Sequence, residues 1–452
     1  MDFIGLNVNK IVFYWRNDTM INKWNICEDP RNNSNKRVLK PPEQLKSIFD
    51  RLKRIIEIPS APGFEQGIAR QLVEEFKPLC DEVHVDYMGN VYGIRRGNPD
   101  GPIIYCPAHT DTTSFIVEHI EQDGYIRFFQ QGLIPPFLPY GERMLIITPN
   151  GIITGVNGTQ AGHSHFSFAG AEGKYYPEEL IKTPMMDEQF IDVGASSREE
   201  ALAMGIRPGQ QMVYDRDLQW LGDGSTGCVT CKGFDDKVGC QSLIEALIQI
   251  QNKEIYPTVV MVGACQEEIG LRGASNAGNL IDPDMCIGVD GTISEAGPQT
   301  NKGFGVGISP NLTMSETASS MGNGVYISVN DLIWGVISGL VGNQRIITKL
   351  TEICENRQIR YEMEGTMPYI TSDPAAAQYQ GKGGTPSVTL KIPVRYTHGP
   401  VECCSLWDVV STGKCLAGFI EELDSSFDLA FIDIPEADHG PKKRRDFYTK
   451  KG

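Results

Sequence analysis

The pattern of hydrophobic and polar positions divides the chain into segments of different kinds. An apolar stripe with helical spacing predicts a helix over residues 43–58, and a second helix is predicted over 65–78. Between about residues 113 and 223, short alternating runs are separated by Gly, Pro and Asn turns, which is typical of a small β-barrel or sandwich. From about residue 224, apolar strands alternate with helices again, which indicates an α/β sheet.

The predicted organisation is therefore an α/β domain that is interrupted by an inserted small β-barrel domain. We assign residues 41–112 and 224–438 to the α/β domain and residues 113–223 to the insertion. Residues 1–40, rich in Asn, Lys and Arg, are predicted to form an N-terminal extension, and residues 439–452 a basic C-terminal tail. The length of 452 residues exceeds what one hydrophobic core usually spans, which agrees with two domains.

Composition and charge exclude several classes of partner. The net charge of −16 disfavours binding to nucleic acid and to anionic membranes. The sequence has no apolar run of 18 or more residues, and its N-terminus lacks the features of a secretory signal. The 12 cysteines are scattered through apolar runs, which is typical of buried thiols in a reducing compartment. We therefore expect a cytoplasmic protein without a nucleic-acid or membrane partner.

Polar side chains follow five predicted strands at the point where each strand ends. They are His109 with Asp111, Asp235 with Asp236, Glu267 with Glu268, Asp290, and His398. Because the carboxyl ends of strands in an open α/β sheet form the crevice where ligands bind, we expect these groups to converge. Histidines with carboxylates and without cysteine suit Zn²⁺, Co²⁺ or Mn²⁺ in an open, catalytic site. Two ions would need a bridging carboxylate, and Asp235 is favoured because it is central in the sequence and lies at a turn.

Each of these residues alone also has a structural explanation. An adjacent pair such as Glu267 and Glu268 is most often a solvated helix cap, Asp290 alone is more often a turn residue, and His398 alone is more often packed or exposed. The chain has only seven histidines, and two of them stand at predicted strand ends that share an edge with carboxylates. This coincidence favours a metal site over a set of separate structural roles.

Six runs of the sequence resemble one known family. They are AHTDTTSFIV, IDVGASSREEA, GFDDKVGC, CQEEIGLRGA, GVDGT and IPVRYTHGPVECCSLWDV. They occur in the order found in the M42 family of metallo-aminopeptidases, and the likeness covers about residues 43–425. This family belongs to the co-catalytic zinc clan, with the M18, M20 and M28 peptidases. The resemblance implies an α/β/α zinc-peptidase catalytic domain with a mixed sheet, and an inserted β-barrel that makes dimer contacts. It also implies a homo-oligomer between a dimer and a dodecamer.

The resemblance also implies a role for each candidate residue. One metal ion would be held by His109, Asp235 and Asp290. A second ion would be held by Asp235, Glu268 and His398. Glu267 matches the general base that activates a metal-bridging water, and Asp111 matches the acid that orients the first histidine. One departure is that Thr112, Thr113 and Ser114 follow this acid, where the family usually carries an acidic residue and Gly.

The expected function is a dinuclear metal-dependent aminopeptidase that removes N-terminal residues from short peptides. Its two divalent ions are expected to be Zn²⁺, with Co²⁺ or Mn²⁺ as alternatives. A second reading keeps the metals and changes the substrate, as in an N-acyl amino acid deacylase or a glycoside hydrolase. Glycosidases use two carboxylates that flank a sugar, which argues against the latter. A third reading is a non-catalytic assembly protein of the same fold, and the complete ligand set argues against it.

Overall fold

The computed structural model describes residues 40–158, 185–294, 320–332, 339–365, 367–368, 371–380 and 384–430. The described residues from Pro41 onward belong to one compact unit. The predicted N-terminal extension, except Lys40, and the predicted basic tail lie outside the described residues. Residues 159–184 of the predicted insertion also lie outside them.

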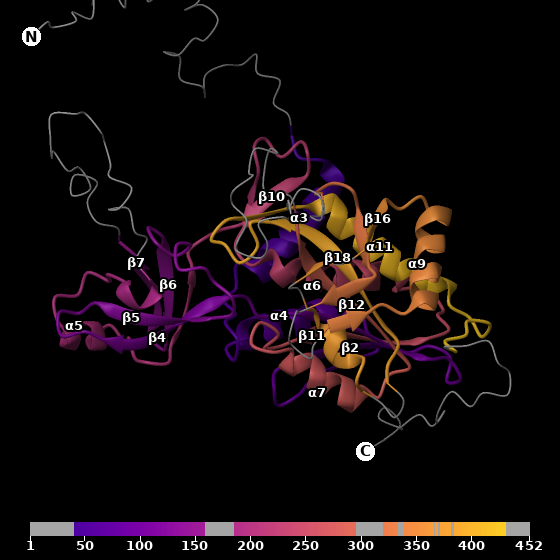
Figure 1. Cartoon of the computed structure of the whole chain (residues 1–452), viewed down its shortest axis with the longest axis horizontal. Coiled ribbons are helices and arrows are strands. Elements are labelled where there is room, and N and C mark those ends of the chain that lie inside the picture. Colours follow the sequence, from indigo (N-terminus) through magenta and orange to yellow (C-terminus); the bar gives the residue numbers. More distant parts are fainter. Residues whose placement is uncertain are drawn as a thin grey trace, which may run out of the picture. The chain divides into compact units, whose positions relative to one another are not determined.

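A mixed sheet of eleven strands forms the centre of the larger unit (Figure 1). Across the sheet the strands are β1 Glu82–Val85, β2 Val91–Arg95, β11 Thr258–Ala264, β3 Ile103–His109, β12 Met285–Ile293, β18 Ser387–Arg395, β19 Glu402–Ser405, β10 Cys228–Cys231 and β9 Gln219–Trp220. Off this path, β13 Val325–Ser328 pairs with β18 and with β16 Tyr361–Glu364. Strands β11, β3, β12 and β18 run parallel, so their carboxyl ends lie at one edge of the sheet.

Helices pack on both faces of this sheet, which confirms the predicted α/β/α class. One face packs against α3 Glu43–Ile56, α4 Gln66–Phe76, α6 Phe234–Ile250, α9 Gln344–Asn356 and α11 Leu406–Glu422. The other face packs against α7 Arg272–Ile281 and α10 Asp373–Ala377. Strand β11 illustrates how the sheet contributes side chains to an apolar core on each face. Val259 and Met261 join the first core, whereas Val260 and Val262 join the second. This alternation follows from the two-residue period of a strand.

The helices predicted from the apolar stripes occur within about two residues of their expected ends. Helix α3 ends at Ile56 rather than at residue 58, and it buries the predicted apolar face at Leu45, Leu52 and Ile55. Among the described residues, no helix is long and apolar enough to cross a membrane. Within the same ranges, none of the eleven cysteines takes part in a disulfide.

A second sheet of five strands lies within residues 114–214. Its order is β5 Ile126–Gln131, β4 Ser114–Ile120, β8 Gln211–Tyr214, β6 Arg143–Thr148 and β7 Gly151–Val156. Main-chain hydrogen bonds join Ile191 to Ile126 of β5 at 2.9 and 3.0 Å, and Asp192 to Val156 of β7 at 2.9 Å. Because residues 191–192 connect the two edge strands, the sheet closes into a small barrel-like ring with its own apolar core.

Smaller elements complete the described chain. They are the 3₁₀ helix Met186–Glu188, α5 Arg198–Ala203, and a three-stranded sheet of β15 Gly339–Val341, β14 Asn330–Leu332 and β17 Met367–Pro368. Ser197 caps α5 by accepting a hydrogen bond from the amide of Glu200 at 3.2 Å, and Glu200 accepts one from the amide of Ser196 at 2.7 Å. The sequence pattern of Ser and Glu therefore marks this helix start correctly.

Candidate metal centre

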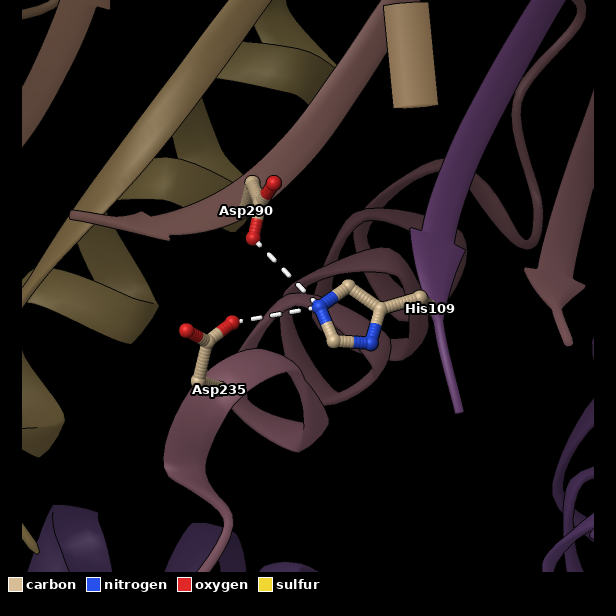
Figure 2. Close-up of side chains that lie close together, drawn as sticks. All are labelled: His109, Asp235 and Asp290. Atoms are coloured by element: carbon tan, nitrogen blue, oxygen red, sulfur yellow. Dashed lines mark hydrogen bonds and ion pairs between the residues drawn. The ribbon is translucent and has the colours of Figure 1, made fainter. Parts of the chain in front are cut away.

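The parallel strands bring the predicted ligands to one edge of the sheet. His109 is the last residue of β3, and Asp290 lies within β12, which continues to Ile293. The register that pairs Met285 with Ile104 places Asp290 beside His109 when it is continued along both strands. Asp235 follows β10 in the first turn of α6. Figure 2 shows the side chains of His109, Asp235 and Asp290 pointing toward one another.

The first group of ligand atoms is centred on His109. Its Nε2 atom lies 3.1 Å from Asp235 Oδ1 and 3.7 Å from Asp290 Oδ1 (Figure 2). Its Nδ1 atom is 3.0 Å from the main-chain carbonyl oxygen of Asp111 and donates a hydrogen bond to it. This bond fixes the orientation of the ring and leaves the Nε2 lone pair available for a cation. The imidazole is almost fully buried.

The second group is centred on His398. Its Nε2 atom lies 3.4 Å from Asp235 Oδ2 and 3.6 Å from Glu268 Oε2. Its Nδ1 atom donates to the main-chain carbonyl of Leu133 at 2.9 Å. In each of the two groups, the ligand atoms all lie within 4.8 Å of one another. Asp235 belongs to both groups and turns one carboxylate oxygen toward each histidine.

The Glu267 side chain lies beside the first group. Its Oε2 atom is 3.9 Å from His109 Nε2. The carboxylate of Asp111 accepts hydrogen bonds from the amides of Glu267 and Glu268 at 2.9 and 3.1 Å, and its Oδ1 atom is 3.7 Å from His109 Nδ1. The expected contact between Asp111 and His109 is thus made by the main-chain carbonyl. The Asp111 carboxylate instead holds the backbone that carries the acidic pair.

Two further buried carboxylates support the site, and the sequence reasoning missed both. Glu65 accepts a hydrogen bond from the amide of Gln266 at 3.0 Å. Glu402 accepts from the amide of His398 at 2.8 Å and from the amide of Phe234 at 2.5 Å. Glu402 stands alone in the apolar run PVECCSL, and a single acid in a buried strand is the signal that could have revealed it.

Two other aspartates near the ligands have different surroundings. Asp236, the neighbour of Asp235, is fully buried and accepts a hydrogen bond from the amide of Gly239 at 2.9 Å, so it stabilises the start of α6. Asp373, at the start of α10, is 2% exposed, and within the described chain neither of its carboxylate oxygens has a hydrogen-bond partner. Burial raises the pKa of Asp373 to about 8.

The charges of the cluster are unbalanced without a cation. Burial raises the pKa of Glu267 well above its usual range, and it raises the pKa of Glu268 to about 7. Burial alone would lower the pKa of His398, but Glu268 and Asp235 together raise it to about 10. Burial likewise opposes the protonation of His109, and the surrounding carboxylates raise its pKa well above the ordinary value.

The donor set therefore fits a pair of divalent cations. Carboxylate oxygens and two imidazole nitrogens, with no thiolate among them, suit ions such as Zn²⁺, Co²⁺ or Mn²⁺. Positive charge placed among these carboxylates would favour their ionised forms, which burial and mutual repulsion disfavour. Both histidines already point their Nε2 atoms at the shared aspartate.

Comparisons with known proteins identify the family and agree with this fold. The family model of the M42 glutamyl aminopeptidases matches residues 89–415. A lysyl aminopeptidase from Pyrococcus furiosus is 30% identical over 376 residues, which cover 83% of this chain and 97% of that relative. The structure of an aminopeptidase from the archaeon Desulfurococcus kamchatkensis has a TM-score of 0.72 and 29% identity, covering 84% of this chain and 96% of that one.

A further similar structure is that of the TET1 peptidase of Pyrococcus horikoshii. Its TM-score is 0.65 at 26% identity, over 83% of this chain and 100% of that chain. That peptidase can assemble into a tetrahedron or a large octahedral shell. This chain therefore belongs to the M42 family of glutamyl aminopeptidases and is a hydrolase that acts on peptides.

Proposed function

We propose that this protein is a dinuclear metal-dependent aminopeptidase that removes N-terminal residues from short peptides. The observation that carries the proposal is the position of Asp235, whose Oδ1 faces His109 at 3.1 Å and whose Oδ2 faces His398 at 3.4 Å. One cation would be held by His109, Asp235 and Asp290. The other would be held by Asp235, Glu268 and His398. Zn²⁺ is the first choice, with Co²⁺ or Mn²⁺ as alternatives.

The proposed chemistry divides the work between the ions and Glu267. When bound, such a pair of cations acidifies a water molecule and polarises the carbonyl of the scissile peptide bond. Glu267 belongs to neither ligand group, so its carboxylate is free to take a proton at Oε2 and to pass it to the leaving amine. Asp111 keeps this side chain in place by holding the amides of residues 267 and 268.

We also propose that residues 113–223 form an inserted domain through which copies of this chain associate. The α/β domain would comprise residues 41–112 and 224–438. Strand β9 falls within the proposed insertion but pairs with β10 of the large sheet, so the polypeptide returns to that sheet before residue 223. Support for association comes from large apolar side chains exposed on the barrel strands, among them Phe129 and Ile152.

A panel of aminoacyl-anilide substrates tests the proposed activity. Protein that has been stripped of metal with a chelator should cleave none of them, and added Zn²⁺, Co²⁺ or Mn²⁺ should restore cleavage. The same panel with acetylated amines separates the alternatives. Turnover of only the blocked substrates would indicate a deacylase, and full activity in verified metal-free protein would refute a metal mechanism. A protein that binds no metal and turns over no substrate would indicate an assembly role.

A further inference from the structure

The proposed inserted domain contacts Glu268 and His398, the two ligands of the second group that the first group does not share. The main-chain carbonyl of Leu133 accepts the hydrogen bond from His398 Nδ1 at 2.9 Å. The main-chain amide of Thr113 donates to Glu268 Oε1 at 3.0 Å. Thr113 immediately precedes β4, and Leu133 follows β5 by two residues, so neighbouring strands of the barrel supply the two contacts. His398 thus has one nitrogen bonded to the barrel and one facing Asp235, and Glu268 has one oxygen bonded to the barrel and one that lies 3.6 Å from His398 Nε2.

Gly132 lies between these two contacts and allows the turn to pass close to Thr113 and Glu268. Gly132 has a φ of +84°, and a Cβ atom there would lie 2.7 Å from Thr113 Cγ2 and 3.1 Å from Glu268 Oε2. Both the backbone conformation and the lack of space therefore exclude a side chain. The turn can reach His398 and Glu268 together only because this residue is glycine.

Among the described residues, the first group has no comparable contact with the insertion. The hydrogen bonds and ion pairs of the His109 and Asp290 side chains all lead to residues outside 113–223. Within this part of the chain, the first group is therefore oriented by the α/β domain, whereas the second group is also oriented by main-chain atoms of the barrel.

We propose that the turn around Gly132, together with the Thr113 amide, is a positioning element that sets the affinity of the second group for its cation. This inference rests on the proposed dinuclear site and extends it, because it gives the inserted domain a role within each subunit. Groups that orient metal ligands typically contribute about 10–100-fold to metal affinity. By linkage, binding of the second cation must in turn stabilise the turn against opening.

Zinc titration of metal-free protein tests the proposal, with Gly132→Ala as the variant. The added methyl group would push against Thr113 and Glu268, so we expect the second Zn²⁺ to bind at least about 10-fold more weakly than in the unaltered protein. The first Zn²⁺ should bind as before. Gly209→Ala is the matched control, because Gly209 lies before β8 of the same barrel, has a φ of +88°, and has no atom within 4 Å of an added Cβ. This substitution introduces similar backbone strain, and we expect the Gly209→Ala variant to bind both ions as tightly as the unaltered protein does.

A second substitution tests the steric mechanism. Thr113→Ser, added to Gly132→Ala, removes the Cγ2 methyl group that the new Cβ would meet at 2.7 Å. Partial recovery of the second Zn²⁺ affinity is expected, because the main-chain amide of residue 113 is retained. Tight binding of both ions by the Gly132→Ala variant would overturn the inference.

Hydrogen exchange of the unaltered protein provides a test that does not depend on folding of a variant. The peptide around residues 131–133 should exchange more slowly after the second equivalent of Zn²⁺ than after the first, while a peptide around Gly209 should not change. Equal exchange at both stages would refute the inference. An unaltered protein that binds fewer than two Zn²⁺ ions would instead contradict the proposed function on which it rests.

Discussion

Both histidines of the candidate centre are oriented in the same way. Each donates its Nδ1 hydrogen to a main-chain carbonyl, from Asp111 for His109 and from Leu133 for His398. Each then directs Nε2 toward the shared Asp235. Because the acceptors are backbone atoms, the orientation of the two rings depends on the path of the chain.

Replacement of Glu267 by Gln tests the proposed division of roles at the residue scale. The variant should retain two Zn²⁺ ions, because Glu267 lies outside both ligand groups. Its kcat for an aminoacyl-anilide should fall by about 10²–10⁴-fold, the usual contribution of a general base. Zinc content and kcat are the measurements. Glu268→Gln serves as the comparison and should lose one of the two ions, and an active Glu267→Gln enzyme would exclude the proposed base.

The sequence indicated the candidate ligands because their residue types carry the chemistry. His109, Asp235 and His398 each lie at or just after a strand, and the two clusters found in the structure contain the residues that the family resemblance implied. The supporting contacts of Glu65 and Leu133 could not be predicted in this way. They involve main-chain atoms of distant segments, and a main-chain amide or carbonyl has no residue-type signal.

At the scale of elements, the parallel strands β11, β3, β12 and β18 explain why the candidate ligands meet. Their apolar runs made them predictable, and the two helices predicted from apolar stripes end within about two residues of the expected positions. Asp290 was expected just after a strand, yet β12 continues to Ile293 because its pairing with β18 extends through Val394. A β-barrel was predicted, but the pairing of residues 191–192 with both edge strands was not, since an alternating pattern identifies a strand without identifying its neighbours.

Glu402 connects two elements of the site, and Glu402→Gln tests that connection. The carboxylate accepts from the amide of His398 after β18 and from the amide of Phe234 at the start of α6. A Gln side chain offers one acceptor oxygen, so one buried amide loses its partner. We expect the free energy of unfolding of metal-free protein to fall by about 1–3 kcal/mol in urea denaturation.

The matched control is Glu74→Gln, since Glu74 is 66% exposed and pairs only with the exposed Lys77. This change should alter stability by no more than about 0.5 kcal/mol. If the two variants are equally stable, Glu402 does not hold the two elements together.

At the scale of the whole molecule, the barrel exposes large apolar side chains that would serve the proposed association. Ile152 on β7 is 58% exposed, and Ile152→Asp should reduce the molar mass measured by light scattering, because a charge cannot be buried cheaply in an interface. Leu280→Asp, at a 38% exposed position on α7 outside the barrel, should leave the assembly intact. An unchanged mass for the Ile152 variant would argue against an interface at this strand.

The order of the candidate ligands along the chain also determines when the centre can form during synthesis. His109 comes first, and His398 comes last, 289 residues later. A ribosome must therefore translate past residue 398 before the second group has all its ligands, and the sheet that orients the first group also lacks β18 until residues 387–395 have been made. A chain that stops before His398 has no complete pair of groups. Under the proposed mechanism, peptide hydrolysis is thus confined to chains that extend beyond this residue.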